Sequence, residues 1–252
     1  MNRLRITILA VTAALILPVF GNASAQEIGI ERATLAEKNA KTPEVSTEQL
    51  RKILVDQSAV VLDTRTSAEF DAGHIPGARN LAAAPDSQVA VVEKMVGGNK
   101  AGALVLYCNG PYCQASRRLG EQLAAAGFTN VRRYQLGIPV WRALGGPTAI
   151  ELSGITRIFN VDKTAVYLDV RSSDDFAKGT LAGAHSVPVE DVISGKLKKI
   201  PLPEDDFNRR IVLFGDGDQA RKLADVLSKR PWHNVSYFPG TFQALSASLQ
   251  NK

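Results

Sequence analysis

Short apolar runs alternate with helical patterns along most of the chain. Val60–Asp63 and Leu104–Tyr107 are continuous apolar runs, as expected of strands that are buried on both faces. Residues 114–126 place Leu119 and Leu123 on one helical face and precede a glycine, which commonly ends a helix. Strands that alternate with helices in this way are typical of α/β proteins. The pattern therefore predicts parallel sheets with helices on both faces.

The chain also repeats itself. The stretch at residues 60–65 returns at residues 166–171 with an offset of 106, and the run at residues 105–107 returns at residues 212–214 with an offset of 107. A repeat of about 100 residues has the usual size of one domain. We therefore predict two tandem α/β domains, over residues 43–147 and 153–249.

The first 25 residues have the pattern of a secretory signal peptide. Two arginines precede an apolar run over residues 6–20, and small residues at 23–25 form a cleavage site. The run is shorter than the ~20 residues that a membrane-spanning helix needs. We therefore expect cleavage, a periplasmic location and no stable membrane insertion of the mature chain. Residues 26–42 are polar and alanine-rich, and are predicted to form a linker or a loosely docked arm.

Composition and charge exclude several classes of function. The 252 residues include 30 Lys and Arg against 25 Asp and Glu, a net charge of +5, which is too mild to predict a nucleic-acid partner. The three histidines and two cysteines do not supply four zinc ligands at recognised spacings. The glycine-rich loops typical of ATP-binding and dinucleotide-binding proteins do not occur in the sequence. We therefore expect neither a metal nor a cofactor.

Both cysteines lie in one short segment between an apolar strand and an amphipathic helix. This is the carboxyl end of a central strand, where open α/β sheets place their sites. Loop amides and the positive end of the following helix favour the thiolate of Cys108 over the thiol. Gly110 permits a positive φ and Pro111 restricts the loop, so the amides can be preorganised. The segment predicts a nucleophile, Cys108, in an anion cradle lined by Asn109, Gly110, Pro111, Tyr112, Cys113 and Gln114.

The loop belongs to an ordered set of motifs that resembles the rhodanese, or sulfurtransferase, superfamily. The set comprises Leu62-Asp63-Thr64-Arg65, Glu69-Phe70, Gly73-His74-Ile75-Pro76-Gly77-Ala78, Tyr107-Cys108, Ser116, Gly127-Phe128, Val131, and Gly137-Ile138 with Trp141. The resemblance implies that Cys108 takes the outer sulfur of a small donor such as thiosulfate and becomes a persulfide. It further implies that the sulfur passes to cyanide, a thiol or a protein acceptor, without any cofactor.

The second copy resembles the same family more weakly. Where the first copy has Tyr107-Cys108, the second has Phe214-Gly215 and then Asp216-Gly217-Asp218. It has no thiol to carry sulfur, and its carboxylates would repel an anionic donor. By analogy with tandem members of the family, we interpret this copy as noncatalytic, shaping the first domain's site or an interface.

Three residues, Arg65, His74 and Cys113, each have a structural and a functional interpretation. Arg65 is a candidate for substrate contact, against the alternative that it pairs with Asp63 to brace the sheet edge. His74 lies in a turn and is interpreted as a hydrogen-bonded structural residue. Cys113 either opens the helix as a small residue or resolves the Cys108 persulfide by forming a disulfide, which requires Cα atoms within about 7 Å.

Three other functions compete with sulfur transfer. A phosphatase of related architecture needs an arginine six residues after the cysteine, where this chain has Gln114. A thiol-disulfide redox protein could use Cys108 and Cys113, although their spacing differs from the C-x-x-C of thioredoxin-like enzymes. A binding module without turnover is compatible with the noncatalytic second copy.

Overall fold

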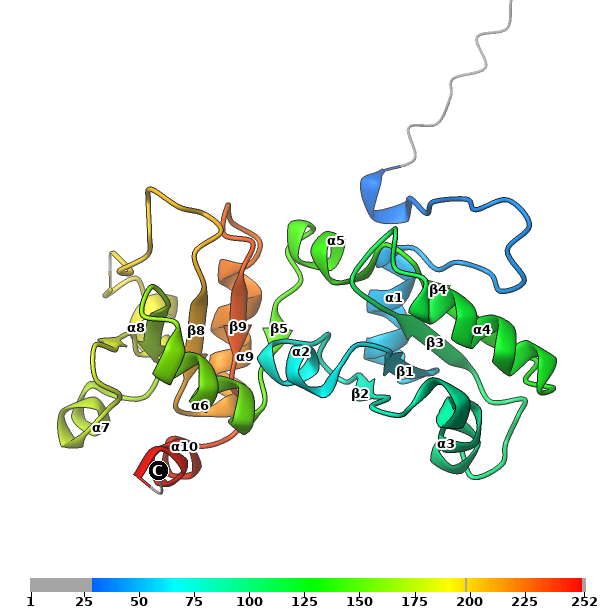
Figure 1. Ribbon diagram of the computed structural model, residues 1–252. Helices are drawn as coiled ribbons and strands as arrows, with labels where there is room; N and C mark the ends of the chain where they lie inside the picture. Colours follow the sequence, from blue (N-terminus) through cyan, green and yellow to red (C-terminus); the bar gives the residue numbers. More distant parts are fainter. Residues whose placement is uncertain (1–28, 198, 251–252) are drawn as a thin grey trace, which may run out of the picture.

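The computed structural model describes residues 29–197 and 199–250, so the predicted signal peptide lies outside the described residues. Two parallel sheets lie side by side, one in each half of the chain (Figure 1). Helices pack on both faces of each sheet, as the buried clusters show. The predicted fold class, two tandem α/β domains, is confirmed.

The first sheet has the strand order β2-β1-β3-β4, and every pairing is parallel. Because Asp63 pairs with Asn80 on one side and with Tyr107 on the other, the carboxyl ends of these strands meet at one edge. Helices α1 and α5 cover one face, and α3 and α4 cover the other. The elements are α1 (Thr47–Asp56), β1 (Val60–Asp63), α2 (Ser67–Ala72), β2 (Arg79–Asn80), α3 (Gln88–Met95), β3 (Leu104–Tyr107), α4 (Ala115–Ala125), β4 (Val131–Tyr134) and α5 (Gly137–Ala143).

Local sequence explains where the first helices begin. Ser46 and Gln49 form a capping box at α1: the Ser46 side chain accepts from the Gln49 amide at 3.2 Å, and the Gln49 side chain accepts from the Ser46 amide at 2.8 Å. Thr66 and Glu69 form the equivalent box at α2. Along β3, Val105 and Tyr107 pack into one cluster and Leu104 and Leu106 into the other, which is why this strand is apolar throughout.

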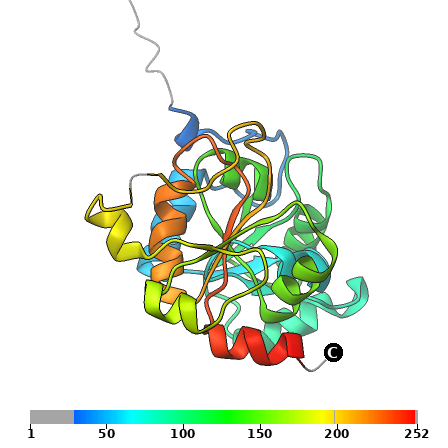
Figure 2. The same ribbon diagram turned by 90° about the vertical axis from the view of Figure 1, so that its left-hand side faces the viewer.

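The second sheet has the order β5-β9-β8-β6-β7 and is also parallel. Helices α8 and α9 cover one face, and α6 and α10 cover the other; in Figure 2 this domain faces the viewer, with α9 in orange and α10 in red. Its first strand, Thr148–Ala149, precedes the predicted domain start at residue 153. The elements are β5 (Thr148–Ala149), α6 (Leu152–Val161), β6 (Val166–Asp169), α7 (Ser173–Lys178), β7 (His185–Ser186), α8 (Val189–Ile193), β8 (Ile211–Phe214), α9 (Gly217–Leu227), β9 (Val235–Tyr237) and α10 (Phe242–Gln250).

The segment before α1 is docked on the first domain. It contains a short 3-10 helix, η1 (Ile30–Arg32), and its Glu37 carboxylate accepts from the buried Arg133 guanidinium at 2.8 Å. Glu44 adds a parallel bridge beside Arg133 of β4. The described part of the predicted linker, residues 29–42, is therefore an arm with specific contacts. Within residues 29–197 and 199–250, no helix is both long enough and apolar enough to cross a membrane.

The two domains contact each other through α2 and α6. Ser153 donates to the Asp71 carboxylate at 2.6 Å, and Arg157 donates to the Ala68 carbonyl at 2.8 Å. His74 and Ala149 exchange two backbone hydrogen bonds of 2.9 Å, which tie the first domain to β5. This junction lies on the side of the first domain that carries α2 (Figure 1).

Candidate active site

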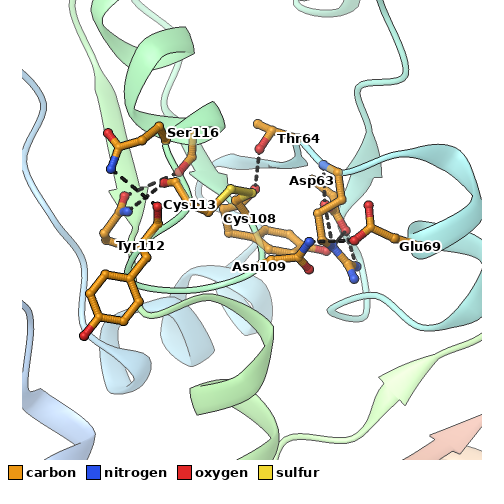
Figure 3. The surroundings of a disulfide bond; sticks show 12 residues. Asp63, Thr64, Glu69, Cys108, Asn109, Tyr112, Cys113 and Ser116 are labelled. Atoms are coloured by element: carbon orange, nitrogen blue, oxygen red, sulfur yellow. Dashed lines mark hydrogen bonds and ion pairs between the residues drawn. A yellow bond between two sulfur atoms is a disulfide. The ribbon is translucent and has the colours of Figure 1, made fainter.

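Cys108 stands at the carboxyl edge of the first sheet, directly after β3. Seven residues, Cys108 to Gln114, connect this strand to α4. Cys108 is 4% exposed, whereas Tyr112 at the tip of the loop is 95% exposed. The structure thus places the predicted nucleophile at the base of a loop whose outer part faces solvent (Figure 3).

The two cysteines form a disulfide across the loop (Figure 3). Their Cα atoms are 6.1 Å apart, within the limit that a disulfide requires. In this oxidised form neither sulfur is a nucleophile, so sulfur chemistry at Cys108 requires reduction of the bond. The structure brings the two thiols together, as one of the two interpretations of Cys113 required.

The loop presents amide groups for an anion. Pro111 has no N–H, and the Cys113 amide donates to the Gly110 carbonyl at 3.0 Å. Among the described residues, no backbone or side-chain acceptor pairs with the remaining amides between β3 and α4, which belong to Cys108, Asn109, Gly110, Tyr112 and Gln114. Gly110 has a φ of 124°, a backbone conformation that residues other than glycine rarely adopt. Five amide donors of this connection therefore have no acceptor within the described protein and are available to an anion.

A glycine of α5 forms the floor beneath the loop. Gly137 has a φ of 65°, and a Cβ there would lie 2.5 Å from the Cys108 carbonyl oxygen and closer still to the Gly110 amide. Ile138 donates its amide to the same Cys108 carbonyl at 3.3 Å. The close approach of α5 thus constrains the backbone from the Cys108 carbonyl to Gly110.

Gln135 holds the other end of the loop. Its side-chain amide donates to the carbonyls of Pro111 and Cys113, both at 3.1 Å. Its amide oxygen accepts from the Arg133 guanidinium at 2.6 Å. Sequence reasoning missed Gln135 and Arg133; the available signal was an arginine inside a strand, since a buried charge needs partners.

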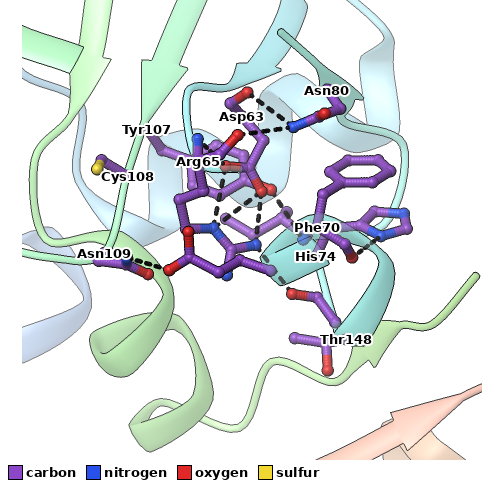
Figure 4. A network of polar contacts seen from close by, with 12 residues as sticks. Asp63, Arg65, Phe70, His74, Asn80, Tyr107, Cys108, Asn109 and Thr148 are labelled. Atoms are coloured by element: carbon purple, nitrogen blue, oxygen red, sulfur yellow. Dashed lines mark hydrogen bonds and ion pairs between the residues drawn. The ribbon is translucent and has the colours of Figure 1, made fainter. Parts of the chain in front are cut away.

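Arg65 lies beneath the loop in a buried ion pair (Figure 4). Its guanidinium donates to the Asp63 carboxylate at 2.5 Å and to the Gly73 carbonyl at 2.9 Å. Burial disfavours its charge, but the hydrogen bonds and charge of Asp63 prevail and raise the pKa of Arg65. The guanidinium also lies 5.9 Å from the ring centre of Tyr107. The contacts of Arg65 are those of a brace under β3.

A carboxylate stands at the rim of the site. Asn109 donates its side-chain amide to Glu69 at 2.6 Å, and this hydrogen bond is the largest cause that lowers the pKa of Glu69 (Figures 3 and 4). Arg117, on the first turn of α4, pairs with Glu121 of its own helix at 3.5 Å. The exposed rim therefore combines the Asn109 amide with the Glu69 carboxylate.

His74 is held as a structural residue. Its Nδ1 lies 3.0 Å from the Phe70 carbonyl oxygen, and its ring stacks on Phe70 with centroids 3.7 Å apart (Figure 4). Burial lowers the pKa of His74, which favours the neutral ring. The side chain points toward α2 and the domain junction.

The second domain has no equivalent of the cysteine loop. Only Gly215 and Asp216 separate β8 from α9. A Cβ at Gly215 would lie 2.8 Å from Arg171 and 2.9 Å from the Asp169 carboxylate. Asp216 caps α9 by accepting from the Gln219 amide at 3.0 Å. The carboxyl edge of the second sheet therefore has neither an amide-lined loop nor a cysteine at this position. Across the described ranges, no group of three His, Cys, Asp or Glu side chains could hold a metal ion.

Comparison with known proteins identifies the family. A model of the Rhodanese-like domain matches the chain twice, over residues 46–144 and 158–248. Thiosulfate sulfurtransferase GlpE of Pseudomonas putida is 30% identical over 96 residues, which are 38% of this chain and 81% of that protein. The crystal structure of a thiosulfate sulfurtransferase from Pseudomonas aeruginosa is 21% identical, with a TM-score of 0.36.

That structural match covers 81% of this chain but 44% of the other, so this chain spans less than half the length of the solved protein. The family model, in contrast, covers most of each predicted domain. This chain therefore belongs to the rhodanese-like domain family and carries two copies of the domain, of which the first holds the cysteine loop.

Proposed function

We propose that the protein is a sulfurtransferase that carries a sulfane sulfur on Cys108. The observation that carries this proposal is the position of Cys108, at the end of β3 in a loop with five unpaired amide donors among the described residues. Similarity to the Pseudomonas putida thiosulfate sulfurtransferase supports the reaction class. The donor would be a small sulfur compound such as thiosulfate, and the acceptor cyanide, a thiol or a protein thiol.

The proposed reaction has two displacements on sulfur. The reduced Cys108 thiolate attacks the outer sulfur of thiosulfate, and the sulfur–sulfur bond of the donor breaks. Sulfite leaves with the electron pair, and Cys108 becomes a persulfide. The acceptor then attacks the outer persulfide sulfur, and Cys108 leaves as the thiolate.

The loop amides supply what both displacements require. Negative charge moves from Cys108 to the departing sulfite and, in the second step, back to Cys108. Amides that are already oriented stabilise this charge without reorganising at the moment of reaction. Asn109 and Tyr112 are exposed and allow an acceptor to approach the loop.

The second domain is proposed to act as a noncatalytic partner of the first. Its short β8 to α9 connection supports this, because it has neither a thiol nor space beside Gly215. We further propose export to the periplasm, supported by the charged, apolar and small-residue pattern of the first 25 residues. The mass of the chain recovered from a periplasmic extract tests cleavage before residue 26.

Intact-mass measurement and peptide mapping test sulfur transfer. The protein is reduced, freed of reductant and incubated with thiosulfate without oxygen, together with Cys108→Ser and Cys113→Ser. We expect one sulfur atom to be added in Cys113→Ser, on the peptide that contains Cys108, and to be removed by cyanide as thiocyanate. Cys108→Ser should gain none. Equal sulfur uptake by Cys108→Ser would contradict the assignment. Capture of a partner protein in a pull-down, with no sulfur uptake by any variant, would favour a binding module.

The disulfide favours a second candidate, a thiol-disulfide redox protein. Cys108 and Cys113 are joined in the structure, and the exposed loop tip is open to a partner thiol. This candidate predicts oxidation of a dithiol protein by the disulfide form, with no added sulfur on either cysteine after exposure to thiosulfate. The mass experiment separates the two candidates.

A further inference from the structure

Cys113 is held by hydrogen bonds to both its backbone amide and its backbone carbonyl. Its amide donates to the Gly110 carbonyl at 3.0 Å, and its carbonyl accepts from Gln135 at 3.1 Å. These two hydrogen bonds fix both sides of the residue. Its Cα lies 6.1 Å from that of Cys108, within the distance that a disulfide requires, and the two sulfurs are bonded.

The orientation of Gln135 is set by groups behind it. Its amide oxygen accepts from Arg133 at 2.6 Å and lies 3.4 Å from the Ser116 hydroxyl, so its NH2 group faces the loop. Arg133 is fully buried and donates to Thr42 at 2.7 Å and to Glu37 at 2.8 Å. A chain of hydrogen bonds therefore extends from the N-terminal arm to the carbonyl of Cys113.

We propose that Cys113 is a resolving thiol, which gives the protein a second activity: release of the bound sulfur as hydrosulfide. This inference rests on the proposed function, since it needs the persulfide on Cys108. The sulfur of Cys113 attacks the inner sulfur, Sγ of Cys108. The bond between that Sγ and the outer sulfur breaks, and the outer sulfur leaves with the electron pair as hydrosulfide and takes up the thiol proton of Cys113.

The electrons of this step balance within the site. The sulfane sulfur gains two electrons and becomes hydrosulfide, and the two cysteine thiols lose two and become the disulfide that the structure shows. A dithiol reductant, small or protein-borne, then returns Cys108 and Cys113 to thiols and is itself oxidised to a disulfide. With thiosulfate as donor, one cycle converts thiosulfate and a dithiol into sulfite, hydrosulfide and a disulfide.

A single-turnover experiment without oxygen tests the inference. The reduced wild-type protein and Cys113→Ser are freed of reductant and mixed with one equivalent of thiosulfate; sulfite, hydrosulfide, free thiols and intact mass are then measured. We expect the wild type to release one sulfite and one hydrosulfide per chain and to lose both thiols. Cys113→Ser should release one sulfite and no hydrosulfide, and should keep the added sulfur until cyanide removes it.

Two results would overturn the inference, and they differ in what else they overturn. If the wild type keeps its added sulfur as Cys113→Ser does, Cys113 does not resolve the persulfide and the proposed sulfur transfer stands. If Cys113→Ser releases no sulfite and gains no sulfur from thiosulfate or from polysulfide, the persulfide itself is lost. Both proposals are then wrong.

Gln135 is the positioning residue for this second step, and Gln135→Glu tests its role. The variant keeps an oxygen for Arg133 but replaces the NH2 group that donates to the loop carbonyls. We expect hydrosulfide release to slow by about 10-fold more than sulfite release, because misplacing a reacting group costs rate in its own step. Equal slowing of both steps would show that Gln135 stabilises the loop as a whole. It would contradict a specific role in positioning Cys113.

Discussion

The residues beneath Cys108 show how a buried charge can serve structure in both copies. The Arg65 guanidinium lies 2.5 Å from the Asp63 carboxylate. The second domain repeats this pair, with 2.6 Å between the Arg171 guanidinium and the Asp169 carboxylate. Arg171 also donates to the Gly179 carbonyl, as Arg65 does to Gly73. Since the pair recurs where no cysteine is present, it favours the structural interpretation of Arg65 over substrate contact.

Removing one partner of this pair tests its role. Asp63→Ala leaves the guanidinium of Arg65 buried without its carboxylate, and we expect a loss of about 3–5 kcal/mol in the free energy of unfolding, measured with urea. Sulfur loading of Cys108 should fall as well. Asp169→Ala is the matched control: it removes the equivalent pair, should also destabilise the protein, and should leave loading unchanged. A loss below about 1 kcal/mol in Asp63→Ala would show that the pair acts like an exposed one.

At the scale of elements, the connection between the central strand and the next helix distinguishes the two domains. Seven residues form it in the first domain and two in the second. The longer connection curls over Gly137, whose missing side chain leaves room for the backbone of Cys108 and Gly110. The connection that carries Cys108 in the first copy is thus five residues longer than its counterpart in the second.

Gly137→Ala tests the close contact between Gly137 and this connection. The new methyl group would collide with the backbone of the loop, at a φ of 65° that is itself unfavourable for alanine. We expect the rate of persulfide formation to fall by about 10²-fold, because the nucleophile and the amides shift relative to the donor. Gly127→Ala is the control, since Gly127 also has a positive φ, of 88°, but only Lys100 lies within 4 Å of its added methyl group. Equal rates for the two variants would contradict the role of Gly137.

At the scale of the whole molecule, α2 and α6 bring the two domains into backbone contact. Gly154 of α6 packs directly against the Asp71 carbonyl, and a Cβ at this position would overlap it. The same α2 carries Glu69, which accepts from Asn109 at the rim of the site. The second domain therefore supports the helix that borders the active-site loop.

Gly154→Ala should separate the two domains. The added methyl group overlaps the Asp71 carbonyl, and overpacking of this kind costs about 1–3 kcal/mol. We expect a lower unfolding temperature and faster proteolysis of the connection at residues 144–152. Ser153→Ala removes only the hydrogen bond to Asp71 and should change proteolysis little. Unchanged proteolysis in Gly154→Ala would show that the backbone contact does not hold the domains together.

We expect His74 to make the stability of the first domain depend on pH near the domain junction. Burial lowers its pKa below the ordinary value of 6.5, opposed by the Phe70 carbonyl, Glu151 and Asp63 and assisted by Arg65. Below pH 6.5 the unfolded chain therefore binds more protons than the folded one, so the free energy of unfolding falls as the pH drops toward the folded pKa. His74→Asn should lose this part of the pH dependence in urea titrations at several pH values. An unchanged slope in the variant would contradict the assignment.

The sequence by itself determined the fold class, the two domains and the cysteine loop. Apolar periodicity and the repeat can be followed along the chain without knowing which segments meet in space. Only the tertiary structure decided what surrounds the loop. Gln135 meets Cys113, and Gly137 meets Cys108, because β3 and β4 are neighbours in the sheet. The two-residue strand Thr148–Ala149 joined the second sheet for the same reason: it is too short to show a period, and only its pairing with β9 defines it.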